Sequence, residues 1–556
     1  MRLTGFSVRN FKSIGNTPAV VRLAPVTLLF GPNGAGKSSL LHALHYAREI
    51  VEHANLDADV TRTGGSLDLG GFANFVHARD LDRDVVLTFD IDLEDDGLPD
   101  TGSVNDVAVM GFEIGHDEIA SLDEATNARV TLTISWSHMV GIPYVARTAV
   151  AIDGEPFAAL EASAEMRSVE FVDLNEFHPV FRSRLAVEPD DLGAGERFAS
   201  LIYRSMTQDG ELVRRAPVHR SRVGALPFLD RNLGLDQDFS SLEEMRGAMA
   251  SDPAETVRMV SERLAINAYA SRAMIGALRA LRDALAALVH VGPLRALPPR
   301  GYLAQRTLDA GRWHSGLAAW DRLHHDDGTL VPVVDDWLSD RLHSGFGVRI
   351  VEERRVPVGS AVDDALRTPS LYYDDELDSA GTVLYGRPVE RRIALTDTGN
   401  YLEVTPHDIG VGISQLLPVI VAALAPENRL VAIEQPELHI HPRLQTQLGD
   451  MFVAAIGAPE AGAADIAPAG GNGRTLLIET HSEHLLLRLL RRIRHTDASD
   501  LAPGEPLVTP ALVAVHYAEP GLNGMEIREL RISRDGDFLD DWPGGFFDER
   551  GDELFK

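Results

Sequence analysis

The chain has 556 residues, 44% of them hydrophobic and 24% charged, which is ordinary for a globular protein of about two to four domains. Its formal net charge of −31 argues against broad nonspecific binding to nucleic acid or anionic lipid, because the whole-molecule field repels phosphate. Cysteine is absent, which excludes disulfides and thiolate metal sites. The N-terminal segment is too short and too polar for a signal peptide, and no apolar run is long enough to span a membrane. We therefore expect a cytoplasmic protein with no membrane partner.

The first element with a clear chemical signature is a phosphate-binding loop of the form GxxxxGK[ST], at Gly31-Pro-Asn-Gly-Ala-Gly-Lys-Ser38. It lies between an apolar run at Val26–Phe30, which predicts a strand, and a predicted helix from Ser39 to about Ile50. In such a loop, backbone N–H groups surround the phosphates, the lysine ammonium reaches the β- and γ-phosphates, and the serine hydroxyl binds Mg²⁺. The residues expected to bind ATP here are Asn33, Gly34, Gly36, Lys37, Ser38 and Ser39.

The use of lysine in the chain supports this interpretation. Lysine occurs only at positions 12, 37 and 556, and the rest of the 52 basic residues are arginine. A planar guanidinium cannot replace a compact ammonium among the phosphates, so a lysine at 37 favours a nucleotide site over a simple glycine-rich turn.

The middle of the chain alternates between strand-like and helical patterns. Strands are predicted at Val85–Leu93 and Arg129–Trp136, with acidic loops at 94–106 and 117–127. The pattern from about 160 to 290 is helical, and its clearest helix begins at Asp252 and runs to about His290. The predicted domains are an N-terminal ATPase lobe at 1–135, a mainly helical insertion at 136–290, a β-rich connecting region at 291–400 and a C-terminal ATPase lobe at 401–556. A loop is predicted at 458–473.

Three apolar runs end in polar residues that suit an ATP site. Besides Val26–Phe30, they are Leu430–Ile433, which precedes Glu434, and Leu476–Ile478, which precedes Glu479-Thr-His481. A buried parallel sheet presents its ligands outside the carboxyl ends of its strands. We therefore expect Glu434, with Ser38, to hold Mg²⁺ and His481 to sense the γ-phosphate.

A second anion site is predicted ahead of the helical run that starts near Leu416. Two glycines precede Ser414, which is predicted to be the N-cap of that helix, and the site comprises Gly412, Ser414 and Gln415. A single nucleotide seldom needs two such sites. The second is therefore expected to serve the ATP of another subunit, which predicts a homodimer that sandwiches ATP.

Together these motifs resemble the ABC-type ATPases of the RecF/SMC/OLD branch. The resemblance matches Gly5–Ser13 to the N-terminal "NFKS" strand, Gly31–Ser38 to Walker A, Gly412–Gln415 to a degenerate signature, Leu430–Glu437 to Walker B and His481 to the switch histidine. It implies an α/β fold, namely an ABC-type P-loop NTPase head with a split ATPase domain and a helical/β insertion. It also implies ATP and Mg²⁺ as ligands, and DNA or an effector protein encoded nearby as partners.

Two further segments extend this resemblance. Glu434–Pro442 is similar to the "EPExHLHP" form of OLD-like proteins, although the chain after His481 is too short for their Toprim domain. The Gly292–Arg295 turn and the tail Asp541–Glu549 are similar to a bacterial subfamily with a W-P-x-G-F-F-D-E extension.

The chain departs from the family at one catalytic position. Gln435 stands where the family commonly has the carboxylate that polarises water, and glutamine is a poor base. Glu437 is the alternative carboxylate. Two functions remain: a slow ATP-hydrolysing switch in genome maintenance or anti-phage defence, and a nucleotide-sensing scaffold with negligible hydrolysis.

For the other polar clusters in the sequence, a structural role is favoured over a binding site. Glu437, His439 and His441 could form a metal cluster, but the family pattern explains them as the loop after Walker B. Two arginine-rich segments are candidate DNA-binding surfaces, although a solvated face is the commoner outcome for a charge run. They comprise Arg214, Arg215, Arg220 and Arg222, and Arg488, Arg491, Arg492 and His495.

Overall fold

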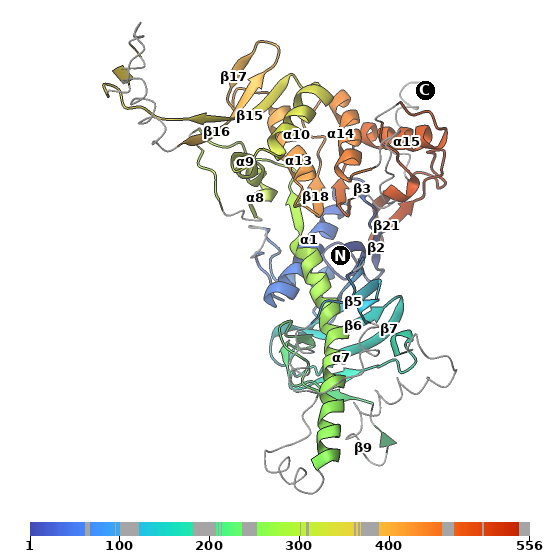
Figure 1. Cartoon of the computed structure of the whole chain (residues 1–556). Coiled ribbons are helices and arrows are strands. Elements are labelled where there is room, and N and C mark those ends of the chain that lie inside the picture. Colours follow the sequence, from blue (N-terminus) through green and yellow to red (C-terminus); the bar gives the residue numbers. More distant parts are fainter. Residues whose placement is uncertain are drawn as a thin grey trace.

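The computed structural model (Figure 1) describes most of the chain. The described residues are 1–61, 67–94, 96–100, 122–181, 207–208, 211–212, 214–235, 253–300, 302–306, 311–360, 363–364, 367, 389–458, 472–502 and 505–543. The predicted cap at Asp252, most of the acidic loops, most of the loop at 458–473, and the tail after Pro543 with Lys556 lie outside these residues.

A six-stranded sheet forms the centre of the upper lobe in Figure 1. All its strands except the last are parallel. In spatial order they are β14 (Leu288–Val291), β18 (Leu430–Glu434), β19 (Thr475–Glu479), β3 (Val26–Phe30), β20 (Val513–Gly521) and β21 (Gly524–Leu530). The three apolar runs picked out in the sequence thus become the neighbouring strands β18, β19 and β3, as predicted. Each is fully buried, because helices cover both faces of the sheet.

Side chains alternate between the two faces of this sheet and pack against different helices. Leu29, Ala432 and Leu477 share a core with α1 (Lys37–His53). Leu28, Ile433 and Ile478 face the opposite core. The helices of that second core are α9 (Leu317–His324), α10 (Leu330–Asp336), α13 (Val411–Leu424), α14 (Pro442–Ala455) and α15 (Glu483–Asp497).

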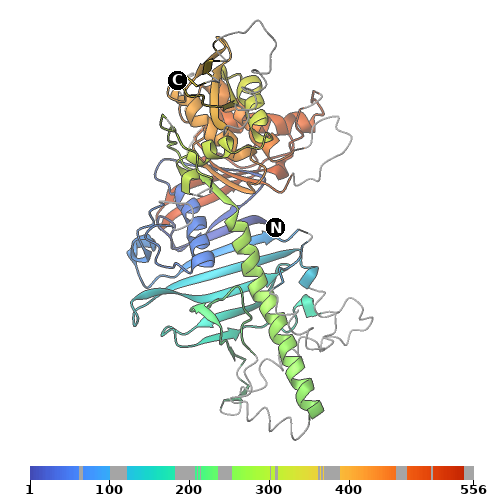
Figure 2. The same cartoon turned by 60° about the vertical axis from the view of Figure 1, so that its left-hand side comes forward.

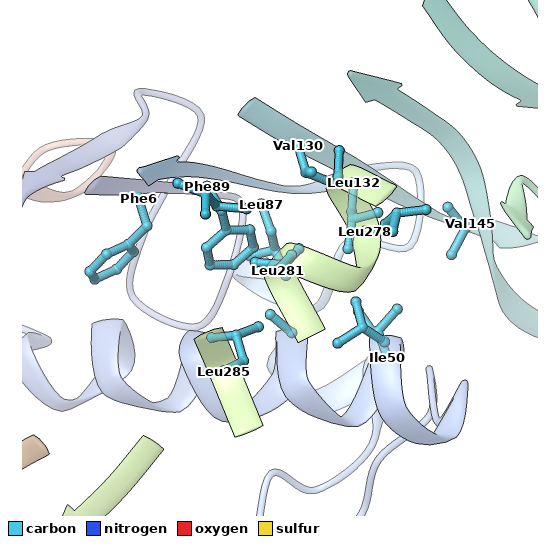
Figure 3. Close-up of a cluster of buried hydrophobic side chains, with 14 of the residues drawn as sticks. Phe6, Ile50, Leu87, Phe89, Val130, Leu132, Val145, Leu278, Leu281 and Leu285 are labelled. Carbon is cyan, nitrogen blue, oxygen red and sulfur yellow. The ribbon is translucent and has the colours of Figure 1, made fainter. Parts of the chain in front are cut away.

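An eight-stranded antiparallel sheet lies on the other side of α1. Its spatial order is β11 (Ala216–Pro217), β8 (Val169–Val172), β7 (Glu155–Ala162), β6 (Ile142–Ile152), β5 (Asn127–Ser137), β4 (Val85–Asp92), β1 (Arg2–Arg9) and β2 (Ala19–Arg22). The long helix α7 (Pro253–Ala286) runs across this sheet in Figure 2. Figure 3 shows Leu281 of α7 next to Leu87 and Phe89 of the sheet, with Ile50 of α1 in the same buried cluster.

The remaining described elements lie outside these two sheets. They are α2 (Phe72–Phe75), η1 (His77–Arg79), η2 (Pro179–Phe181), β9 (Thr207–Gln208), β10 (Glu211–Leu212), β12 (Ser221–Val223), β13 (Leu226–Pro227), α8 (Gly311–His314), η4 (Trp337–Arg341), β15 (Phe346–Glu353), β16 (Glu390–Asp397), β17 (Leu402–Val404) and η5 (Pro510–Leu512). Of these, β15, β16 and β17 form a three-stranded sheet of their own. Across the described ranges, no helix is both long and apolar enough to cross a bilayer.

The prediction of a mainly helical insertion at 136–290 is wrong for its first half. Strands β6, β7 and β8 continue the antiparallel sheet, and a boundary at 135/136 would cut through β5 and separate it from its partner β6. The region alternates buried and more exposed residues along β6 and β8, a period of two that indicates strands. The helical interpretation holds for α7.

The predicted helix ending near His290 is also too long. Helix α7 ends at Ala286, and Leu288 begins β14, which pairs in parallel with β18. The leucines up to Leu285 continue the helical period, but the following Val289 and Val291 favour an extended chain that can enter the central sheet. The correction moves His290 from a helix end to β14, the edge strand of the ATPase sheet next to β18.

Candidate ATP site

The phosphate-binding loop joins β3 to α1, and Gly36 caps the helix. Its φ of 102° lies in the left-handed region. A Cβ at this position would lie 2.1 Å from the Ser13 Oγ. Glycine is therefore required both by the backbone conformation and by the close approach of the N-terminal segment. That segment is held further by the contact between the Ser13 and Ser39 hydroxyls, 3.2 Å apart.

Lys37 lies at the base of the loop with only 3% of its surface exposed. Its Nζ donates to the carbonyl oxygens of Gly31 (2.9 Å) and Pro32 (3.1 Å). It also lies 3.4 Å from His481 Nε2 and 3.7 Å from Glu479 Oε1. Burial lowers the pKa of Lys37, and the neighbouring Glu479 opposes this shift. The site thus holds a largely dehydrated ammonium, which interacts strongly with an anion.

The hydroxyl of Ser38 lies between two carboxylates from neighbouring strands. The Ser38 Oγ is 3.0 Å from Glu479 Oε2 and 3.3 Å from Glu434 Oε2. Burial acts to raise the pKa of Glu434, but the hydrogen bond and charge of His290 outweigh it and lower that pKa. For Glu479, burial and the charge of Glu434 raise the pKa. A serine hydroxyl with carboxylates is an oxygen ligand set of the kind that Mg²⁺ prefers.

A cavity of about 370 Å³ opens onto these groups. It is lined by Lys12, Ser13, Asn33, Gly34, Gly36, Lys37, Ser38, Ser39, His42 and Glu479. All six phosphate-loop residues predicted to bind ATP thus border one hollow. Lys12, Ser13, His42 and Glu479 are additions to the sequence prediction; Glu479 could have been found, because it ends an apolar run as Glu434 does.

Gln435 and Glu437 are tied into the structure around the site. Gln435 has a φ of 44°, and its backbone N–H donates to the Glu479 carbonyl at 2.7 Å. Both carboxylate oxygens of Glu437 accept hydrogen bonds, from the Thr480 hydroxyl (2.8 Å) and the His481 N–H (2.7 Å). Burial raises the pKa of Glu437. Glu437 therefore holds Thr480 and His481 in place, and its oxygens are already occupied by these donors.

The predicted N-cap at Ser414 is wrong. Helix α13 begins at Val411 with Gly410 as its N-cap, and Ser414 lies inside the first turns, 1% exposed, with its hydroxyl donating to the Val411 carbonyl at 2.9 Å. The two glycines before Ser414 led to the prediction that the helix begins after them, but Gly412 lies within the helix. A Cβ on Gly412 would meet the His439 carbonyl at 2.5 Å, so this glycine allows the loop after β18 to pack closely.

Arg295, which sequence analysis placed only in a turn, connects α13 to the Walker B strand. The Arg295 Nη2 donates to the carbonyl of Glu434 at 2.5 Å and to that of Gln435 at 3.3 Å. The Gln415 side chain binds the backbone of the same arginine. Gln415 is therefore used inside the chain, and the predicted contribution of its side chain to a second nucleotide would require these bonds to break.

The hydrogen bonds and ion pairs of the other polar clusters show what these residues do in the fold. The His441 side chain accepts from the Arg443 N–H as the N-cap of α14. The only group of three or more potential ligands within the described ranges lies elsewhere, so Glu437, His439 and His441 do not converge. Most of the arginines of the two candidate DNA surfaces face acids: Arg214 pairs with Glu176, Arg215 with Glu161 and Glu170, and Arg488 and Arg492 with Asp450.

Comparison with known families covers both halves of this split site. Residues 6–48 match a family model described as an AAA domain. Residues 325–488 match a second model, described as an AAA domain, putative AbiEii toxin, Type IV TA system. Both halves of the split site thus match AAA-domain models, and the chain has the motifs of a P-loop ATPase. The fold class predicted from the motifs, an α/β ABC-type head whose ATPase domain is split, is confirmed.

Solved structures similar to this ATPase include three SMC head domains. They are the head from Thermotoga maritima (10% identity, TM-score 0.34, covering 96% of this chain and 100% of that one), the head with a coiled coil and joint from Pyrococcus yayanosii (11%, 0.35, 96% and 98%), and the head with an extended coiled coil bound to the C-terminal domain of ScpA from Pyrococcus furiosus (10%, 0.35, 95% and 96%). Because these TM-scores are low, the assignment rests on the family models and on the site. No curated protein sequence matches the chain.

Proposed function

We propose that this ATPase is a slow ATP-hydrolysing switch whose subunits pair around ATP and act on DNA or on an effector protein. The observation that carries the proposal is the position of Ser38, whose hydroxyl reaches the carboxylates of both Glu434 and Glu479 beside the buried ammonium of Lys37. This arrangement of one cation, one hydroxyl and two carboxylates suits a nucleoside triphosphate with Mg²⁺.

Each group has a role in the proposal. Lys37 binds the β- and γ-phosphates, and Ser38, Glu434 and Glu479 hold Mg²⁺ directly or through water. When bound, Mg²⁺ neutralises phosphate charge. Burial, followed by the charge of Lys37, lowers the pKa of His481, so its imidazole is neutral and can hydrogen-bond to the γ-phosphate.

Slow turnover follows from the residues around the attacking water. Gln435 can orient water but cannot take its proton. Glu437 is engaged by Thr480 and His481. The same observation favours the second candidate function, a nucleotide-sensing scaffold in which ATP joins two subunits and hydrolysis is negligible.

Pairing of subunits is proposed through the N-terminus of α13. Val411 there is 58% exposed, although the rest of the helix is largely buried. The first N–H groups of a helix attract anions, and this end of α13 is held to the Walker B strand through Gln415 and Arg295. The proposal includes the role in genome maintenance or anti-phage defence expected from the motifs; one of the two matching family models is described as an AAA domain, putative AbiEii toxin, Type IV TA system.

The test is steady-state ATP hydrolysis by the full chain with and without DNA, together with light scattering with and without Mg·ATP. Turnover that Lys37→Ala abolishes, with an ATP-dependent doubling of mass, supports the switch. Pairing without measurable turnover supports the scaffold. If neither ATP turnover nor an ATP-dependent change in mass is observed, both candidates fail.

A further inference from the structure

Four histidines converge behind the Walker B carboxylate, and the proposed ATP chemistry uses none of them. His42 and His45 come from α1, His290 from β14 and His314 from α8. The His290 Nε2 lies 2.8 Å from Glu434 Oε1, and the His290 Nδ1 lies 3.0 Å from His45 Nε2. The ring of His314 lies against that of His290, with their centroids 4.8 Å apart.

Three of these groups are spaced as metal ligands. One ligand atom each from His290, His314 and Glu434 lies within 4.8 Å of the other two. His290 is 4% exposed and Glu434 is 7% exposed, so little water competes for the site. Ligands of a tetrahedral zinc ion lie about 3.3 Å apart, given Zn–N and Zn–O distances of about 2.0–2.2 Å, so small side-chain movements would bring the three into place.

The cluster also contains buried nitrogens that no protein group satisfies. Among the described residues, the Nδ1 atoms of His45 and His314 are buried without a hydrogen-bond partner. For His314, one of the three spaced groups, such an unpaired buried atom is unusual and calls for a ligand that the protein itself does not supply; His45 lies outside these three groups.

We propose that His290, His314 and Glu434 form a site for a divalent transition-metal ion of the Zn²⁺ class, next to but distinct from the Mg²⁺ position at Ser38. Two imidazoles and one carboxylate suit zinc, whereas Mg²⁺ prefers oxygen alone. His45 supports the site: when His290 binds through Nε2, its Nδ1–H donates to His45 Nε2.

Glu434 connects the two metal positions. Its Oε1 faces His290, and its Oε2 faces Ser38. A transition-metal ion on Oε1 withdraws negative charge from the Mg²⁺ side, so it lowers ATP turnover. Metal binding itself does not depend on the proposed function, but this effect on turnover does.

The test uses the full chain without an affinity tag, treated with chelator and measured without nucleotide or Mg²⁺. We expect one Zn²⁺ per chain by titration calorimetry, and a visible absorption spectrum of tetrahedral type when Co²⁺ is used as the probe. His314→Ala is expected to weaken Zn²⁺ binding at least tenfold, whereas His343→Ala, a change at an exposed histidine, leaves it unchanged. Lys37→Ala, which removes the nucleotide contact, is expected to bind Zn²⁺ as the wild type does.

Wild-type protein that binds no Zn²⁺, or His314→Ala that binds it with wild-type affinity, would overturn the proposal. Because His290 is buried, its substitution could destabilise the fold, so the thermal unfolding of His290→Gln is measured alongside its metal binding. Loss of the Co²⁺ spectrum in a folded His290→Gln chain supports the site, and retention of that spectrum argues against it. A separate assay adds Zn²⁺ to saturating Mg·ATP; turnover should fall in the wild type and not in His314→Ala.

Discussion

Arg295 and Gln415 bind each other through two hydrogen bonds although they belong to different elements. The Arg295 N–H donates to Gln415 Oε1 at 2.9 Å, and the Gln415 Nε2 donates to the Arg295 carbonyl at 2.5 Å. The Arg295 guanidinium then reaches the carbonyl of Glu434. Through this pair, the start of α13 and the end of the Walker B strand are held in one relative position.

Gln415→Ala is expected to lower the free energy of unfolding by about 1–3 kcal/mol, because it leaves buried backbone groups of Arg295 unpaired. ATP should still bind at Lys37, which lies on a different element. Thermal unfolding and ATP titration measure the two effects. Gln447→Ala, a change at a glutamine that bonds the Arg341 carbonyl near the surface, is the control and should alter neither. Equal stability of Gln415→Ala and wild type would show that the pair is dispensable.

Lys37→Ala is expected to weaken ATP binding by about 10- to 100-fold or more, because charge-assisted hydrogen bonds of about 1.5–3 kcal/mol are lost. Lys37→Arg should also bind poorly, since the planar guanidinium does not fit among the two loop carbonyls. Isothermal titration gives the affinities, and Arg531→Ala, a change at an exposed arginine, controls for loss of charge. Unchanged ATP affinity in Lys37→Ala would remove the assignment of the site.

Glu434→Gln and Glu479→Gln are each expected to keep ATP binding and to lower Mg²⁺-dependent turnover at least tenfold, because each removes a negative charge next to Ser38. A titration of turnover against Mg²⁺ should show a higher Mg²⁺ requirement in both variants. Glu352→Gln on the surface is the matched control. If only one of the two variants has an effect, the other carboxylate does not contribute to the cation site.

Gln435→Glu is expected to raise turnover, because it supplies the missing carboxylate at the water position. Glu437→Gln is expected to lower turnover and thermal stability together. The glutamine side chain has only one acceptor oxygen, so either the Thr480 hydroxyl or the His481 N–H meets the amide NH₂ group and loses its hydrogen bond. A fall in kcat with no change in stability would instead identify Glu437 as the base. Single-turnover kinetics and thermal unfolding separate these outcomes.

Val411→Glu is expected to abolish ATP-dependent pairing while leaving ATP binding intact, because it places a negative charge at the exposed N-terminus of α13. Val411 is preferred over Ser414 for this test because Ser414 is buried. Mixing Lys37→Ala and Val411→Glu chains should restore part of the activity, since a mixed pair has one intact composite site. Val358→Glu at another exposed valine is the control. Heterodimers without activity would contradict the shared site.

The parts of this fold that the sequence predicts are those with local signals. The phosphate loop has a fixed spacing, and β3, β18 and β19 are continuous apolar runs because both faces of their sheet are buried. The polar residues that follow them could be placed at one sheet edge for the same reason.

The parts that sequence analysis missed depend on contacts between distant segments. The sequence predicts a helix up to His290, because the helical period of α7 runs to its last residues; only the pairing of β14 with β18 shows where the strand begins. Arg295 bonds backbone atoms of residues far along the chain, and a backbone acceptor has no sequence signature. The prediction of an N-cap at Ser414 is wrong because glycines before a helix usually indicate a loop. Here Gly412 belongs to the helix, and it is a glycine because the His439 carbonyl approaches it closely, a contact that the sequence does not show.

The order of strands in the central sheet also determines when an ATP site can form during synthesis. Strand β3 ends at Phe30, but its neighbours begin only at Thr475 and Val513. At about 5–20 residues per second, an apolar strand and its phosphate loop emerge from the ribosome tens of seconds before their partners. We therefore expect the ATP site to assemble only after β19 and β20 have been synthesised. Truncation before β19 leaves a polypeptide whose unpaired strand edge is available to chaperones or to aggregation.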